Sequence, residues 1–147
     1  MSFFSSLDIS ASGLTAQRLR MDLISQNIAN ANTTKTDDGT PYRRKVLIFQ
    51  QRSSDKPFSE YLSESSKAKV GGAGVRVLKV AEDQTPFKRV YDPSNPDADK
   101  DGYVSMPNVD VTTEMVNMIS ASRSYEANIS ALNATKSMAM KALEIGK

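Results

Sequence analysis

Two long segments with a heptad repeat of apolar residues, one near each end of the chain, constrain the fold most strongly. In residues 7–31 apolar side chains recur every seven positions, with further apolar ones at offsets of three or four positions. This spacing places a stripe on one face of an α-helix. Because such a helix is stable in water mainly through burial of its stripe, it needs a packing partner. The stripe contains Leu7, Leu14, Met21 and Ile28, with Ala11, Ile24 and Ala31 beside it.

A second long helix is predicted from Asp110, a suitable N-cap, to Ile145, next to the helix-terminating Gly146. Its apolar residues fall on the a and d positions of one heptad frame. Polar residues at two of these positions argue against a simple two-stranded zipper and favour a seam shared among several helices. The two series are Val111, Met118, Tyr125, Leu132 and Ala139, and Met115, Ser122, Ile129, Lys136 and Leu143.

Short β-strands are predicted between the helices. The run from Val46 to Phe49 is β-branched and aromatic, and shorter strand patterns follow it. Prolines interrupt residues 92–102, so this segment is expected to be a loop. Residues 50–74 are rich in Ser and Lys and are interpreted as a loop that is mobile or ordered by a partner. The predicted strands are 42–49, 75–80, 88–91 and 103–106.

These patterns predict an α+β fold in which long N- and C-terminal helices pack as a coiled-coil-like pair, with a small antiparallel β unit inserted between them. In the alternative, each helix packs on the β unit within one compact α+β domain. The predicted divisions are an N-terminal helix segment, a central β unit that includes the 50–74 loop, and a C-terminal helix segment. Their bounds are 1–34, 35–108 and 109–147.

The composition excludes several classes of function. Without cysteine or histidine, the chain has no Ser–His or Cys–His nucleophilic pair and no thiolate or imidazole metal cage. A net charge of +2 with interspersed signs does not favour nucleic-acid binding, and the basic run 43–45 is interpreted as the solvated start of a strand. No apolar run approaches the ~18 residues of a membrane span. The N-terminal residues lack the pattern of a cleavable signal peptide.

One acidic loop resembles half of a calcium site. Asp97, Asp99 and Asp101, followed by Gly102, match the first half of an EF-hand loop. The twelfth position is Asn108, which cannot supply the closing bidentate carboxylate. We therefore interpret the segment as a turn rich in Asp and expect no metal, no cofactor and no enzymatic activity, with a calcium module as the competing interpretation.

Side-chain amides are unusually dense in both predicted helices, although Asn is a poor helix former. One interpretation is fraying and C-capping. The other is that the amides, with Gln17 and Arg123, form hydrogen bonds across packed helices and set their register, as an amide at an a position does in coiled coils. The amides are Gln26, Asn27, Asn30, Asn32, Asn117, Asn128 and Asn133.

Both ends of the chain carry motifs of a known family. Residues 12–17, Ser-Gly-Leu-Thr-Ala-Gln, and 25–33, Ser-Gln-Asn-Ile-Ala-Asn-Ala-Asn-Thr, resemble the N-terminal signature of the rod and hook proteins of the bacterial flagellum. Residues 114–128 resemble the C-terminal motif of that family, and 74–77 and 92–110 resemble a short rod protein within it. The 50–74 segment matches no family motif.

The resemblance implies a structural subunit of the proximal rod of the basal body, exported by the flagellar type III apparatus without a cleavable signal and located in the periplasm-spanning rod. It implies terminal helices that are loose before assembly and then line the export channel. Implied partners are other proximal and distal rod proteins, the MS-ring and rod adaptor, and the export apparatus. Another rod protein of the family and a free-standing helical adaptor are the alternatives.

The predicted assembly interface combines the apolar stripes with the polar residues that would set register. We expect hetero-oligomeric helical assembly through these side chains, with no membrane insertion. They are Leu7, Leu14, Gln17, Met21, Ile24, Asn27, Ile28, Asn30, Met115, Met118, Arg123, Tyr125, Asn128, Ile129 and Leu132.

Overall fold

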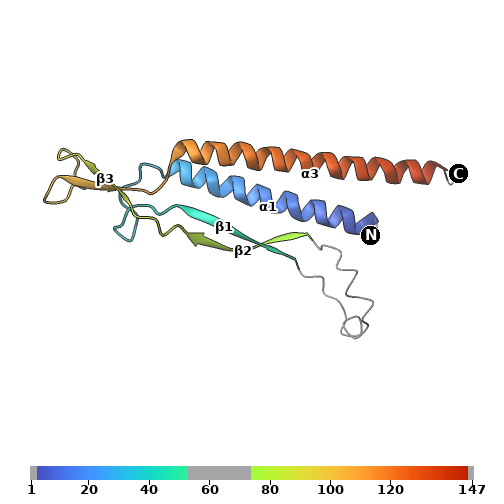
Figure 1. The fold of residues 1–147 in the computed structure, drawn as a ribbon, viewed down its shortest axis with the longest axis horizontal. Coiled ribbons are helices and arrows are strands. Elements are labelled where there is room, and N and C mark those ends of the chain that lie inside the picture. Colours follow the sequence, from blue (N-terminus) through green and yellow to red (C-terminus); the bar gives the residue numbers. More distant parts are fainter. Residues whose placement is uncertain (1–2, 53–73, 146–147) are drawn as a thin grey trace, which may run out of the picture. The chain divides into compact units, whose positions relative to one another are not determined.

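The computed structural model describes residues 3–52 and 74–145 of this 147-residue protein. Two long helices, at the beginning and end of the chain, enclose two small strand pairs in the sequence (Figure 1). The predicted α+β class is confirmed. The elements are α1 (Phe3–Ala29), β1 (Lys45–Gln51), β2 (Val75–Glu82), β3 (Lys88–Tyr91), β4 (Tyr103–Met106) and α3 (Val111–Ile145).

The helix ends follow local chemistry. At its N-terminus α3 is capped by Asp110, whose carboxylate accepts hydrogen bonds from the backbone N–H of Thr112 at 3.3 Å and the hydroxyl of Thr113 at 2.6 Å. This confirms the predicted N-cap. After Ala29, α1 passes into a turn in which the backbone N–H of Asn30 donates a hydrogen bond to the carbonyl of Gln26.

The strands form two separate two-stranded sheets, β1–β2 and β3–β4. In the antiparallel β3–β4 pair, Val90 lies opposite Val104 and Tyr91 opposite Tyr103. These two strands have the bounds predicted from the sequence, whereas β1 begins three residues later than predicted and β2 continues two residues further. Most of the predicted 50–74 loop, residues 53–73, lies outside the described residues.

The chain divides into two compact units, each of which contains parts of both long helices. The first unit comprises residues 1–18, 49–78 and 123–147, and the second comprises residues 19–48 and 79–122. This division follows spatial contacts, whereas the predicted boundaries near residues 34 and 108 follow the helix ends. The predicted boundaries stay a prediction.

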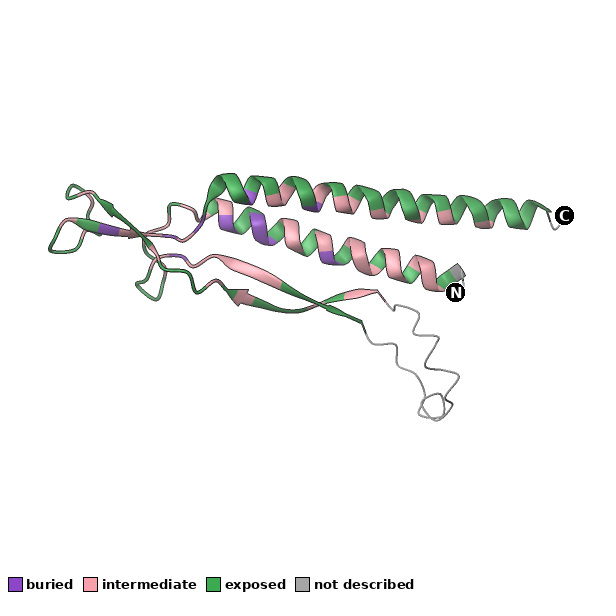
Figure 2. Cartoon of the chain, viewed as in Figure 1, coloured by how far each residue is buried: buried purple, intermediate pink, exposed green. Residues whose placement is uncertain are grey.

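Buried side chains gather in the second unit. Figure 2 shows buried residues on both long helices and on β4. Among the described residues of the first unit, only Ala16 is buried. No helix in the described part of the chain is long and apolar enough to cross a membrane. The buried apolar side chains of the second unit are Leu23, Ile24, Tyr42, Val104, Val109 and Ala121, with Pro107.

Candidate assembly site

The interior of the second unit contains a polar network, and Asn27 of α1 lies at its centre. The side-chain NH2 of Asn27 donates to the carbonyl of Lys45 and to Oε2 of Glu114, both at 2.9 Å. Its Oδ1 accepts from the hydroxyl of Tyr42 and the backbone N–H of Lys45, both at 3.0 Å. With 1% of its surface exposed, Asn27 therefore uses every donor and acceptor of its amide inside the chain.

Glu114 of α3 is the buried charge of this network. Its Oε1 accepts from Arg44 through Nε at 3.0 Å and Nη2 at 2.7 Å, and only 1% of Glu114 is exposed. Arg44 also contacts Asp83 through Nη1 at 3.1 Å. Because a buried carboxylate is costly unless it is paired and hydrogen-bonded, these partners are what allow Glu114 to occupy the interior.

Asn108, in the connection between β4 and α3, completes the network. Its Oδ1 accepts from the backbone N–H of Arg44 at 2.8 Å, and its Nδ2 donates to the carbonyl of Asp83 at 3.0 Å and to Thr85. One side chain thus connects the segment before β1, the segment after β2 and the approach to α3.

The electrostatics follow from these contacts. The backbone N–H of Thr85, helped by Arg44, lowers the pKa of Asp83 below its ordinary value. Burial acts to lower the pKa of Arg44, but hydrogen bonds from its guanidinium to Glu114 and Asp83 raise it overall. Burial, with the charges of Glu114 and Glu82, raises the pKa of Tyr42. These hydrogen bonds therefore favour the charged form of Arg44.

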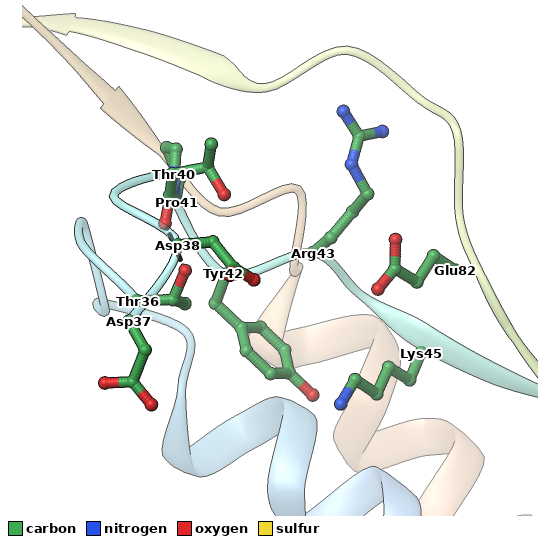
Figure 3. A pocket seen from close by; sticks show the side chains of 9 residues that line it. All are labelled: Thr36, Asp37, Asp38, Thr40, Pro41, Tyr42, Arg43, Lys45 and Glu82. Atoms are coloured by element: carbon green, nitrogen blue, oxygen red, sulfur yellow. Dashed lines mark hydrogen bonds between the residues drawn. The ribbon is translucent and has the colours of Figure 1, made fainter.

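Beside this network lies a shallow hollow of about 290 Å³ with both acidic and basic side chains on its walls. In Figure 3 the ammonium group of Lys45 points toward the hydroxyl end of Tyr42, and its nitrogen lies 5.8 Å from the ring centre. Charges of both signs and an open mouth do not define a site for a small molecule. The lining residues are Thr36, Asp37, Asp38, Thr40, Pro41, Tyr42, Arg43, Lys45 and Glu82.

The acidic loop that resembles half of an EF-hand is engaged within the chain. Asp97 accepts a hydrogen bond from the hydroxyl of Thr34 at 2.7 Å, and Asp99 lies 3.5 Å from the guanidinium of Arg89. Among the described residues, no three acidic side chains are grouped closely enough to hold a metal ion. That Asp97, Asp99 and Asp101 bind no calcium stays a prediction.

Two contacts in the first unit involve the small residues Ser12 and Gly13 of α1. The hydroxyl of Ser12 donates to the carbonyl of Ile9 at 2.7 Å and accepts from the backbone N–H of Val75 at 3.1 Å, which attaches α1 to the start of β2. On α1, Gly13 leaves room for Asn128 of α3, whose amide atoms lie 3.1 Å from the place of a Cβ. The Ser-Gly pair of the N-terminal motif therefore contacts two elements, β2 through Ser12 and α3 through Gly13.

The structure places the predicted interface residues in three environments. Two of them, Ile24 and Asn27, are buried within the chain, whereas three on α3 are exposed. Gln17 is half-buried, and its Oε1 is enclosed without a hydrogen-bond partner among the described residues. As an assembly interface the set stays a prediction. The exposed members are Met115, Arg123 and Ile129, and the half-buried ones are Leu7, Leu14, Gln17, Met21, Ile28, Asn30, Met118, Tyr125, Asn128 and Leu132.

Sequence reasoning missed the charged part of the polar network, Arg44, Asp83 and Glu114, together with Asn108. The interpretation of residues 43–45 as a solvated strand start was wrong for Arg44, because its guanidinium reaches the buried Glu114 and its side chain is 23% exposed. One signal was available: Glu114 is the only charged residue between Val111 and Ser122. A lone charge in an otherwise neutral helix segment indicates a specific partner.

Comparison with known proteins defines the class of this fold. Residues 7–35 match the family described as "Flagella basal body rod protein", and residues 100–145 match "Flagellar basal body rod FlgEFG protein C-terminal". The two matches cover α1 from Leu7 onward with its following turn, and β4 with α3. The class is therefore that of the rod proteins of the bacterial flagellum.

Full-length relatives narrow the class. The chain is 52% identical to the flagellar basal-body rod protein FlgC of Bacillus subtilis, with 100% of both chains covered. It is 49% identical to FlgC of Borreliella burgdorferi, with 99% of this chain and 98% of that one covered, and 46% identical to FlgC of an Escherichia coli O6:H1 strain over 100% of both. The chain belongs to the FlgC family of flagellar basal-body rod proteins. It is a structural rod subunit of the flagellar basal body and assembles with other basal-body components.

Proposed function

We propose that this protein builds the proximal rod by helical self- and co-assembly around the export channel, without enzymatic activity. Its neighbours are other proximal and distal rod proteins, the MS-ring and the rod adaptor, and it reaches them through the flagellar type III export apparatus. Full-length similarity to FlgC proteins supports this proposal, as does the resemblance of both terminal motifs to the rod and hook family.

The observation that carries the proposal is an exposed apolar row at the start of α3. Val111, Met115 and Ile119 follow one another at intervals of four residues, and 56% of Met115 and 53% of Ile119 are exposed. Val116 lies beside them and is also exposed. Residues four apart share one helix face, so these side chains form a continuous apolar surface, which we call the α3 outer face.

Covering the α3 outer face would stabilise an assembly. Transfer of each of these side chains out of water contributes on the order of 1 kcal/mol, given that each is already partly covered. A contact between this face and a different surface of the next subunit is heterologous, and repeated heterologous contacts that do not close into a ring build open helical structures. A rod requires assembly of this kind.

A charge on the α3 outer face tests the proposal. Ile119→Asp should reduce recovery of the chain in purified basal bodies at least about tenfold and abolish swimming, because the buried carboxylate would have no partner. The matched control is Ala142→Asp, which adds the same charge at an exposed position of α3 that does not belong to the four-residue series of the row. Circular dichroism of both variants should match the unchanged chain. Normal incorporation of a folded Ile119→Asp chain would reject the α3 outer face as the contact surface.

A further inference from the structure

The rotation of α3 about its own axis is opposite to what apolarity alone would select. Over residues 111–121, the row of Val111, Met115 and Ile119 faces outward, whereas the charged Glu114 and the small Ala121 face inward with 1% and 0% of their surfaces exposed. Hydrophobic burial by itself would turn the apolar row inward and leave the carboxylate in water. A specific interaction must therefore hold the observed rotation.

The groups that receive Glu114 are held in place by segments outside α3. Asn27 is anchored by the backbone of Lys45 and the hydroxyl of Tyr42, and the backbone of Arg44 is anchored by Asn108. Their free donors, the amide of Asn27 and the guanidinium of Arg44, converge on the two oxygens of Glu114. A carboxylate is the one type of side chain that accepts at both oxygens, so this site selects Glu114.

We propose that Asn27, Arg44 and Glu114 are positioning residues for assembly: together they set the rotation of α3 and so keep the α3 outer face turned toward a neighbouring subunit. The proposal rests on the proposed function for the use of that face. The rotation itself is a property of the single chain, and it can be measured without a rod.

Because the chain contains no cysteine, a single introduced thiol can report the rotation. The reporters are Ile119→Cys on the outer row and Ala121→Cys on the inner one, each in its own full-length chain in dilute solution. A water-soluble thiol reagent should label the first at least about tenfold faster than the second, since a buried thiol reacts only when the helix opens locally.

Glu114→Gln should reduce this rate ratio to below about threefold. In either orientation the new amide points a donor at the donors of Asn27 or Arg44, which leaves buried groups unpaired. The control is Glu126→Gln, which removes the same charge from an exposed position of α3 and should leave the ratio unchanged.

Circular dichroism establishes that each variant is folded. If Glu114→Gln does not fold, Arg44→Lys provides the second test, because it keeps the charge and loses the forked donor geometry, and it should lower the ratio partially. An unchanged ratio in folded Glu114→Gln or Arg44→Lys chains would overturn the proposal. Neither result bears on the incorporation of Ile119→Asp, so the two proposals can fail separately.

Discussion

The two units of this protein use opposite means to hold the same pair of helices. In the second unit, α1 and α3 meet through buried polar groups, because Asn27 of α1 donates to Glu114 of α3 and Arg44, just before β1, pairs with the same carboxylate. In the first unit, they meet where a side chain is missing, at Gly13 beside Asn128. A polar network selects one rotation and one register, because donors and acceptors must coincide. Contacts of small residues bring backbones close but discriminate less between neighbouring arrangements.

Removal of the buried charge of Glu114 is the strongest test of the role of the polar network in the second unit. Glu114→Leu should lower the free energy of unfolding of the second unit by about 3 kcal/mol, because it leaves the guanidinium of Arg44 half-buried and unpaired on one side. Adding Arg44→Met should return much of that loss, since an apolar pair no longer contains an uncompensated charge. Urea unfolding followed by circular dichroism measures both values. If the free energy of unfolding falls equally in the single and the double variant, packing rather than charge pairing dominates at this site.

The small-residue contact of the first unit is tested at Gly74. This residue has a φ of +91°, and a Cβ there would overlap the hydroxyl of Ser12. Gly74→Ala should therefore cost about 2 kcal/mol and increase hydrogen exchange of the Val75 amide, whose acceptor is Ser12. Gly74→Ala combined with Ser12→Ala removes the overlap but keeps the φ strain. If the double variant is as stable as the unchanged chain, backbone strain contributes nothing at this position.

Acid should weaken the second unit through its carboxylates. The pKa values of Asp83 and Asp110 are held below the ordinary value of 3.8, Asp83 chiefly by the N–H of Thr85 and Asp110 chiefly by the hydroxyl of Thr113. The unfolded chain therefore binds protons first as the pH falls, and the stabilisation that these groups contribute above pH 4 is lost as the pH drops through their folded pKa values.

Urea midpoints measured from pH 6 to pH 3 should accordingly decline below about pH 4. Asp110→Asn keeps a capping side chain without a titrating group, so it should flatten part of that decline. A decline of equal size in Asp110→Asn together with Asp83→Asn would assign the acid sensitivity to other carboxylates.

The smallest expected effect concerns an unsatisfied group in the first unit. The Oε1 atom of Gln17 is buried without a hydrogen-bond partner among the described residues. Gln17→Met keeps the length of the side chain and removes the unpaired acceptor, so it should raise the free energy of unfolding by about 1 kcal/mol. Gln26→Met, at an exposed position of α1, is the control and should change little. A destabilised Gln17→Met chain would mean that the amide contributes a contact of its own.

Much of the fold could be predicted because its signals are local. The strands 88–91 and 103–106 were predicted with their observed bounds, and Asp110 was identified as the N-cap from residue type and position alone. The candidate site was less predictable. Asn27 attracted attention as an amide that could set register across helices, but its partners in the structure, Lys45, Tyr42 and Glu114, lie 15 to 87 positions away in the chain.

The sequence by itself determined that the chain has two long terminal helices around short strands, that it lacks cysteine and histidine chemistry, and that it belongs among flagellar rod proteins. These properties depend on periodicity, composition and short motifs, which a linear chain displays directly. Only the tertiary structure decided which face of α3 turns inward. Heptad spacing aligns side chains along a helix but does not choose between competing faces, and that choice depends on where folding brings Asn27 and Arg44.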